Sequence, residues 1–222
     1  MKKILLTGFE PFGDTPINPA EKVAKHLDGA KIDGALVVSR IVPSKFFACI
    51  DAVRSAIEEV EPEAVVMMGE YGGRSMLTVE RIAQNLNDGD RYQLVDNAGR
   101  SMKGELTAPD GPVAYYTTLP IRAMVRAMRD AGIPTDLSDV TGTFCCNHLM
   151  YGILHYLAEA GSDVRAGWIH LPHLPEVAAL DRNLGAPSMS VETAAAGLRI
   201  AIGAILSNPT DSDASIVSRW QI

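Results

Sequence analysis

The sequence lacks a hydrophobic run long enough to cross a bilayer, and it lacks any run of lysine and arginine. A membrane-spanning helix needs about 20 apolar residues, so no such helix is expected. The missing basic runs and the formal net charge of −7 argue against general affinity for nucleic acid or anionic membranes. The apolar part of the N-terminal segment, residues 4–6, is too short for a signal peptide, and we expect a first strand there.

Cysteine is also scarce, with 3 residues in 222. An odd number cannot pair completely, and a disulfide between the neighbours Cys145 and Cys146 would be strained. Because no export signal is recognised, reduced thiols in the cytoplasm are the expected state.

Apolar segments with strand character alternate with segments that have one apolar helical face. The expected strands are residues 4–7, 35–42, 64–68, 76–82, 136–140 and 167–171, and the expected helices are residues 44–60, 120–131, 147–160 and 191–206. This alternation predicts an α/β fold with a mostly parallel central sheet and helices on both faces. The length and the hydrophobic fraction of 47% suit a single domain over residues 1–222.

Two polar segments lie outside this pattern. Residues 85–111 are rich in Gly, Asp and Asn and are long for a loop, so we interpret them as a candidate functional lid. Residues 207–222 form a polar C-terminal tail that we expect on the surface, with Trp220 either anchoring it or lying at a subunit contact.

Cys146 lies between a strand expected to end at Val140 and a helix expected to begin near Asn147. Backbone N–H groups at a helix start favour negative charge, so this position should lower the thiol pKa and suit an oxyanion. It is also the sheet edge at which α/β enzymes carry reactive groups. The alternative for Cys146, and the expected role of Cys145, is a small buried core side chain.

A thiol nucleophile needs a base, and the base needs a group that orients it. His170 ends an expected strand, so it shares a sheet edge with Cys146 if both strands are parallel; a histidine that only caps the strand is the alternative. Glu80 lies in an apolar strand-like segment, where a carboxylate is costly unless it is paired. An imidazole is a suitable partner, whereas Arg81 should face the opposite side of the strand.

A zinc site is the competing use of these side chains. The candidate donors fit no CxxC or HExxH spacing, so we expect neither a metal nor a cofactor; they are Cys145, Cys146, His148, His170 and His173.

Short blocks along most of the chain match, in order, the motifs of a known family. They are TGFEPFG (7–13), NP (18–19), GGR (72–74), ERIAQN (80–85), DN (96–97), GPVAYY (111–116), TLP (118–120), AGIP (131–134), GTF (142–144), CNHLMYG (146–152), IHLP (169–172) and LP (174–175). On these blocks the sequence closely resembles pyroglutamyl-peptidase I, or pyrrolidone-carboxylate peptidase, a family of cysteine peptidases. The resemblance implies a twisted α/β sheet, a cytoplasmic homotetramer and removal of an N-terminal pyroglutamyl residue from peptides without a cofactor.

The resemblance also implies roles for individual residues. The family's Cys-His-Glu triad corresponds to Cys146, His170 and Glu80, the residues that the chemical reading selects. An arginine in the loop after the glutamate contributes to the oxyanion site in relatives, and Arg91 is the candidate here, with a mobile surface arginine as the alternative.

The substrate is a flat lactam without a free amine, so the family binds it in an apolar slot with polar edges. The resemblance implies that Phe9, Phe12 and Phe144 line this slot, although each could instead be core packing. Asn18 and the backbone of residues 69–71, which include Glu70, would meet the polar edges. Such a site rejects a free amino terminus, because its ammonium would be buried unpaired.

Two positions depart from the family's pattern. Glu70 stands where the family usually has an amide, and its carboxylate would oppose a thiolate at Cys146. Cys145 stands where an aliphatic residue is common. Two alternatives to a peptidase therefore remain at this point: a non-catalytic protein that binds pyroglutamyl peptides, and a metal-dependent hydrolase or phosphorylase on a similar sheet.

Overall fold

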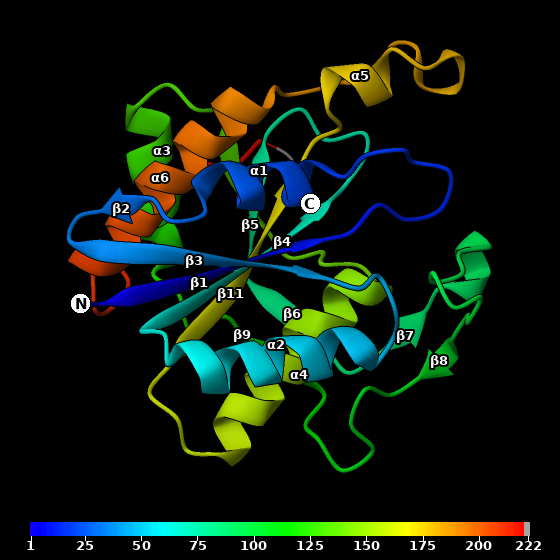
Figure 1. Ribbon diagram of the computed structural model, residues 1–222, viewed down its shortest axis with the longest axis horizontal. Coiled ribbons are helices and arrows are strands. Elements are labelled where there is room, and N and C mark those ends of the chain that lie inside the picture. Colours follow the sequence, from blue (N-terminus) through cyan, green and yellow to red (C-terminus); the bar gives the residue numbers. More distant parts are fainter. Residues whose placement is uncertain (220–222) are drawn as a thin grey trace.

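The computed structural model describes residues 1–219, and its centre is a seven-stranded sheet in the order β10-β5-β11-β4-β1-β3-β2 (Figure 1). The strands of this sheet are β1 (Lys3–Phe9), β2 (Lys31–Ile32), β3 (Ala35–Val42), β4 (Ala64–Glu70), β5 (Leu77–Glu80), β10 (Thr135–Ser138) and β11 (Arg165–Leu171). Two small two-stranded sheets, β6-β9 and β7-β8, are built from β6 (Ile82–Gln84), β7 (Asn87–Asp88), β8 (Lys103–Glu105) and β9 (Ala114–Tyr116).

Helices cover both faces of the central sheet (Figure 1). They are α1 (Pro19–Leu27), α2 (Ala48–Val60), α3 (Ile121–Asp130), α4 (Cys145–Glu159), α5 (Pro175–Ala178) and α6 (Val191–Ser207), with short 3-10 turns η1 (Asp90–Tyr92) and η2 (Asp181–Asn183). α1, α3 and α6 pack into one apolar core, and α2 and α4 into the other. The predicted α/β fold with a mostly parallel sheet is confirmed. Within residues 1–219, no helix combines the length and the apolar character needed to traverse a bilayer.

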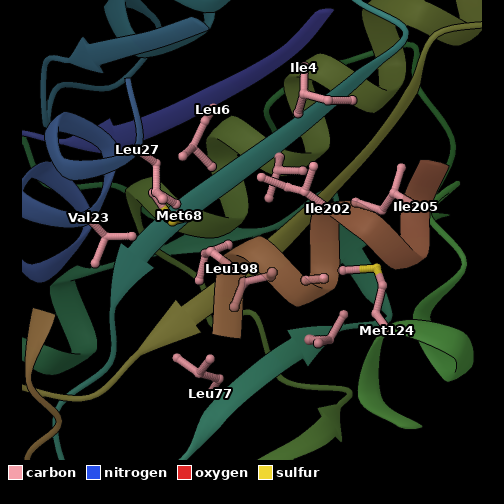
Figure 2. Packing of buried hydrophobic residues seen from close by; sticks show 14 of the residues in the cluster. Ile4, Leu6, Val23, Leu27, Met68, Leu77, Met124, Leu198, Ile202 and Ile205 are labelled. Atoms are coloured by element: carbon pink, nitrogen blue, oxygen red, sulfur yellow. The ribbon is translucent and has the colours of Figure 1, made fainter. Parts of the chain in front are cut away.

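The two cores explain why the central strands read as unbroken apolar runs. β1 and β4 lie in the middle of the sheet, so side chains on both of their faces are buried. On α3 the buried residues recur at helical spacing, as at Ile121, Met124, Val125 and Met128. Figure 2 shows Met124 of α3 and Leu198 and Ile202 of α6 packed over the strands.

The central sheet is mixed, and this corrects one premise of the sequence reading. β5 pairs with β10 in parallel but with β11 antiparallel, so the strand before Cys146 and the strand of His170 run in opposite directions. The expected strand 76–82 also ends at Glu80, after which Ile82–Gln84 pairs with β9 instead. The expected helix from residue 44 begins at Ala48.

Residues 85–111 are not a structureless loop. They contain β7, η1 and β8, and the Asn85 side chain binds the backbone of Thr107 and Ala108. At the other end of the chain, the tail lies against α3, where the Asp211 carboxylate accepts hydrogen bonds from the Arg122 and Ala123 N–H groups. Trp220, the expected anchor, lies outside the described residues.

Candidate active site

The site is organised around a buried contact between β5 and β11. The Nδ1–H of His170 donates a hydrogen bond of 2.8 Å to Glu80 Oε1, and both side chains are buried. In the antiparallel register Trp168 lies opposite Glu80, and His170 lies opposite Thr78, so these side chains share one face of the sheet. The structure thus brings together the base and the orienting acid that the sequence predicts.

The charges of this pair follow from its surroundings. Burial alone would raise the pKa of Glu80, but the hydrogen bond from His170 and the positive charge of Arg74 hold that pKa below its ordinary value. Burial lowers the pKa of His170 by more than Glu80 raises it. At neutral pH the acid is therefore ionised and the imidazole is neutral. Its Nε2 is buried and has no hydrogen-bond partner within residues 1–219, so it is available as a base.

Arg74 is a further member of the site that the sequence reading did not identify. Its Nη1 lies 2.6 Å from Glu80 Oε1, and its Nη2 donates a hydrogen bond of 2.9 Å to the Val140 carbonyl. The signals in the sequence are its place in the GGR block at 72–74 and the room that a buried carboxylate has for a second partner besides an imidazole. Arg81, by contrast, pairs with the exposed Asp139, as the alternation of strand side chains requires.

Cys146 lies next to Gly69 of β4, the residue that pairs with His170 of β11. In the parallel register of β4 and β11, Gly69 is the partner of His170. A Cβ on Gly69 would lie 2.9 Å from Cys146 Sγ and 2.6 Å from Trp168 Cζ2, so the sulfur occupies the space that a side chain there would fill. Since Gly69 and His170 project to the same face, the thiol lies one strand away from the imidazole.

The helix start beside Cys146 comes earlier than expected. α4 begins at Cys145, with Phe144 at the N-cap, so Cys146 is the second helical residue and is partly exposed. The N–H groups of a first turn have no partner within the helix. They are available to a negatively charged oxygen near the sulfur.

The pKa of the Cys146 thiol is raised rather than lowered, contrary to the expectation from the helix start. Burial is the main cause, and the negative charges of Glu80 and Glu70 add to it, whereas the Arg74 guanidinium opposes them. A neutral thiol is thus the resting form, and a base is needed to remove its proton. Cys145 is buried in the core of α2 and α4, as expected.

Aromatic side chains cluster beside the thiol. The rings of Phe12 and Phe144 have centroids 5.6 Å apart, and Phe46, which the sequence reading missed, meets Phe144 edge-on at 5.3 Å. Phe9 is buried and packs against Trp168, with ring centroids 5.7 Å apart. Phe12 and Phe144 are half-buried, so they remain candidates for a wall of a slot.

His148 supports this aromatic cluster. Its buried ring accepts a hydrogen bond of 2.9 Å from the Phe47 N–H, and its Nδ1–H donates to Thr107 Oγ1. The Phe46 ring also packs edge-on against it. Burial lowers the pKa of His148 to about 4, so the ring is neutral at neutral pH.

The remaining predicted residues have different surroundings. The Asn18 side chain caps α1 by accepting from the Ala20 N–H, and its amide donates to the Glu10 carbonyl. Glu70 accepts a hydrogen bond of 2.7 Å from His173 Nδ1, and burial raises its pKa. Arg91 is exposed in η1, and its guanidinium carbon lies 4.7 Å from the centroid of the Tyr92 ring.

Metal binding finds no support in the side-chain arrangement. In the part of the chain that the structure describes, no group of three or more His, Cys, Asp or Glu side chains is placed to hold a metal ion.

Comparisons with known proteins agree on one family. The family model described as pyroglutamyl peptidase matches residues 2–208. A pyrrolidone-carboxylate peptidase of Mycobacterium tuberculosis is 61% identical over 222 residues, which are 100% of both chains. One from Cupriavidus taiwanensis is 46% identical over 213 residues, which are 95% of this chain and 96% of the relative.

Solved structures agree as well. The crystal structure of Bacillus amyloliquefaciens pyroglutamyl peptidase I superposes with a TM-score of 0.91 at 37% identity, covering 96% of this chain and 100% of that one. A mutant pyrrolidone carboxyl peptidase from P. furiosus gives 0.88 at 36% identity, covering 93% and 99%. On its sequence and its fold alike, the chain belongs to the pyroglutamyl peptidase family.

Proposed function

We propose that this protein is a cysteine peptidase that removes an N-terminal pyroglutamyl residue from peptides, with Cys146, His170 and Glu80 as its catalytic triad. The observation that carries the proposal is the buried hydrogen bond between His170 and Glu80, one strand away from Cys146. Family membership supports the substrate class.

In the proposed reaction, His170 Nε2 takes the proton of the Cys146 thiol while the sulfur attacks the carbonyl carbon of the scissile amide. First-turn N–H groups of α4 stabilise the oxyanion. The imidazolium then protonates the leaving amine, and a thioester remains. Water attacks the thioester as His170 takes its proton and returns it to the sulfur, which releases pyroglutamate. Glu80 holds the imidazole in the tautomer that this sequence requires.

The substrate residues are part of the same proposal. The cluster of Phe12, Phe46 and Phe144 supplies apolar surface for the flat lactam ring, and Phe9, packed against Trp168, remains a further candidate. Asn18 and the backbone around Glu70 remain the candidates for the lactam's polar edges. Arg91 is exposed and lies over the Tyr92 ring, so we rank it below the α4 N–H groups.

The test is release of a chromogenic amine from a pyroglutamyl amide. Cys146→Ser should lower kcat/KM by roughly 10³-fold or more, as expected for loss of a nucleophile. Cys145→Ser is the matched control, since it makes the same change one residue away at a core position. Equal activity in wild type and Cys146→Ser would remove Cys146 from the mechanism.

The same assay separates the alternatives. A thiol peptidase is inactivated by iodoacetamide and is indifferent to chelators and phosphate. A metal-dependent hydrolase would lose activity with a chelator, and a phosphorylase would need phosphate. A non-catalytic relative would bind pyroglutamyl peptides without releasing the amine.

We further propose that residues 1–222 form one peptidase domain that assembles into a cytoplasmic homotetramer acting on peptides rather than on nucleic acid or membranes. The family resemblance supports this assembly and location. Light scattering of the purified protein and fractionation of cells that express it test the two statements, and a monomer or a membrane-bound protein would contradict them.

A further inference from the structure

Arg74 is almost completely buried, although arginine is normally exposed. Its side chain is 8% exposed, and the Glu80 carboxylate that it meets is fully buried. Nη1 contacts Glu80 Oε1 at 2.6 Å and also the Thr78 hydroxyl, while Nη2 donates to the Val140 carbonyl. Burying a guanidinium is costly unless its donors are satisfied, and here they bind three different groups.

Arg74 and His170 share one oxygen of Glu80. His170 Nδ1 lies 2.8 Å from Oε1, the same atom that Nη1 of Arg74 approaches. A carboxylate oxygen has two lone pairs, so both donors can be accepted together. The guanidinium therefore fixes the rotation of the carboxylate and, with it, the direction from which the imidazole is held.

The same guanidinium touches the segments that carry the other two triad members. Val140 belongs to the turn that leads from β10 to Cys146 at the start of α4. The ring of Tyr71 lies under the guanidinium, 3.8 Å from its central carbon, and meets His170 edge-on at 5.2 Å. One planar cation thus connects the strand of Glu80, the turn before Cys146 and the aromatic neighbour of His170.

We propose that Arg74 is a positioning residue of the reaction, whose guanidinium holds the Glu80 carboxylate ionised and oriented toward His170 while Tyr71 covers it. The inference rests on the proposed triad. A planar fork is required, because a lysine ammonium cannot span Glu80 and the Val140 carbonyl in the same geometry.

The alternative is a merely structural role, in which Arg74 neutralises a buried acid and nothing more. Several other charged or titratable groups lie on the elements around the imidazole and thiol and contribute to any charge effect. They are Glu80 on β5, Glu70 at the end of β4, Cys146 on α4 and His173 beyond β11. The test must therefore show that Arg74 acts through Glu80 in particular.

The first arm compares Arg74→Met with Arg81→Met. The two arginines are seven positions apart, and Arg81 pairs with the exposed Asp139 instead. Arg74→Met should lower kcat/KM by about 10- to 100-fold, mostly through kcat, because substrate contacts stay in place. Arg81→Met should stay within about twofold of wild type.

The pH profile reports on the Arg74 charge at the reacting groups, which a loss of packing alone would leave unchanged. The Arg74 charge lowers the pKa of both Cys146 and His170. In Arg74→Met the acid limb of kcat/KM, and the pH dependence of alkylation of Cys146 by iodoacetamide, should therefore move to higher pH. Arg74→Lys keeps the positive charge, so the acid limb of its kcat/KM profile should stay near its wild-type pH. Its kcat should recover only in part, because the planar guanidinium is lost.

The deciding arm compares Glu80→Gln with the double variant Glu80→Gln/Arg74→Met, in which both members of the buried pair are neutral. If Arg74 acts through Glu80, the loss of kcat/KM that Arg74→Met causes in the Glu80→Gln background should be only about threefold or less. The same loss in both backgrounds, or pH profiles that do not move, would overturn the inference. Failure of wild type to release the amine would instead overturn the proposed function, and alkylation would still report on Arg74.

Discussion

Replacing Gly69 with alanine tests the placement of the thiol directly. The added Cβ would lie 2.9 Å from Cys146 Sγ and 2.6 Å from Trp168 Cζ2. Non-bonded carbon atoms pack at about 3.5–4.0 Å, so both neighbours must retreat by about 1 Å. Trp168 is a large, fully buried ring with little room to move, and we therefore expect the sulfur to move most.

The size of the effect follows from these distances. A misplacement of about 1 Å at a reacting group costs on the order of 100-fold in rate, so kcat/KM for the pyroglutamyl amide should fall by about that factor. Overpacking of a dense core costs about 1–3 kcal/mol. At about 2–4 °C per kcal/mol for a domain of this size, the melting temperature should fall by several degrees.

Gly203→Ala is the control. Gly203 lies in α6, where an added Cβ meets only the end of the Asp33 side chain, at 2.8 Å. Alanine favours a helix interior over glycine by about 1 kcal/mol, so stability should hold or rise and activity should not change. Wild-type activity and an unshifted melting temperature in Gly69→Ala would show that the sulfur does not lie against β4, and the reasoning about the site would fail.

Three further predictions concern the surroundings of the site. Because the pKa of His148 is lowered to about 4, its contribution to stability is complete above its unfolded pKa and is lost as the pH falls. The free energy of unfolding, measured with urea, should fall by about 2 kcal/mol between pH 7 and pH 5. A His148→Gln variant that shows the same fall would contradict this. Glu70→Gln removes a negative charge that raises the thiol pKa, so Cys146 should be alkylated faster at neutral pH; an unchanged or slower rate would count against that charge effect. Asn18→Ala should cost about 1 kcal/mol in the same unfolding assay, through loss of its cap on Ala20, and an unchanged midpoint would rule out that cap as a source of stability.

The side-chain chemistry of single residues predicted more of the site than the expected strand directions did. Glu80 and His170 were identifiable because a carboxylate in an apolar strand needs a buried partner. The premise that parallel strands bring His170 to the edge of Cys146 is nevertheless wrong, since β10 and β11 run antiparallel. The sequence does not encode this direction locally: β5 is four residues long and reads the same in either orientation.

The missed features have similar physical causes. Arg74 precedes Glu80 by six residues across a turn, so neither helical nor strand periodicity links them. β7 and β8 have only two and three residues, too few for an alternating pattern to appear, and polar composition alone suggested a loop. Phe46 lies in the loop before α2, and His148 lies in α4. The two side chains meet only through tertiary packing, so no local sequence pattern links them.

The resting protonation state links these observations. A thiolate at Cys146 would face the carboxylates of Glu80 and Glu70, with the Arg74 guanidinium as the opposing charge, while burial penalises the ion further. His170 is likewise neutral at rest, because burial outweighs the effect of Glu80. In the proposed mechanism the proton therefore moves when the sulfur attacks, and the positive charge then created on the imidazole is met by the carboxylate that already faces it. On this view the buried acid stabilises the transition state rather than the resting pair, which is why its orientation by Arg74 should appear in kcat more than in KM.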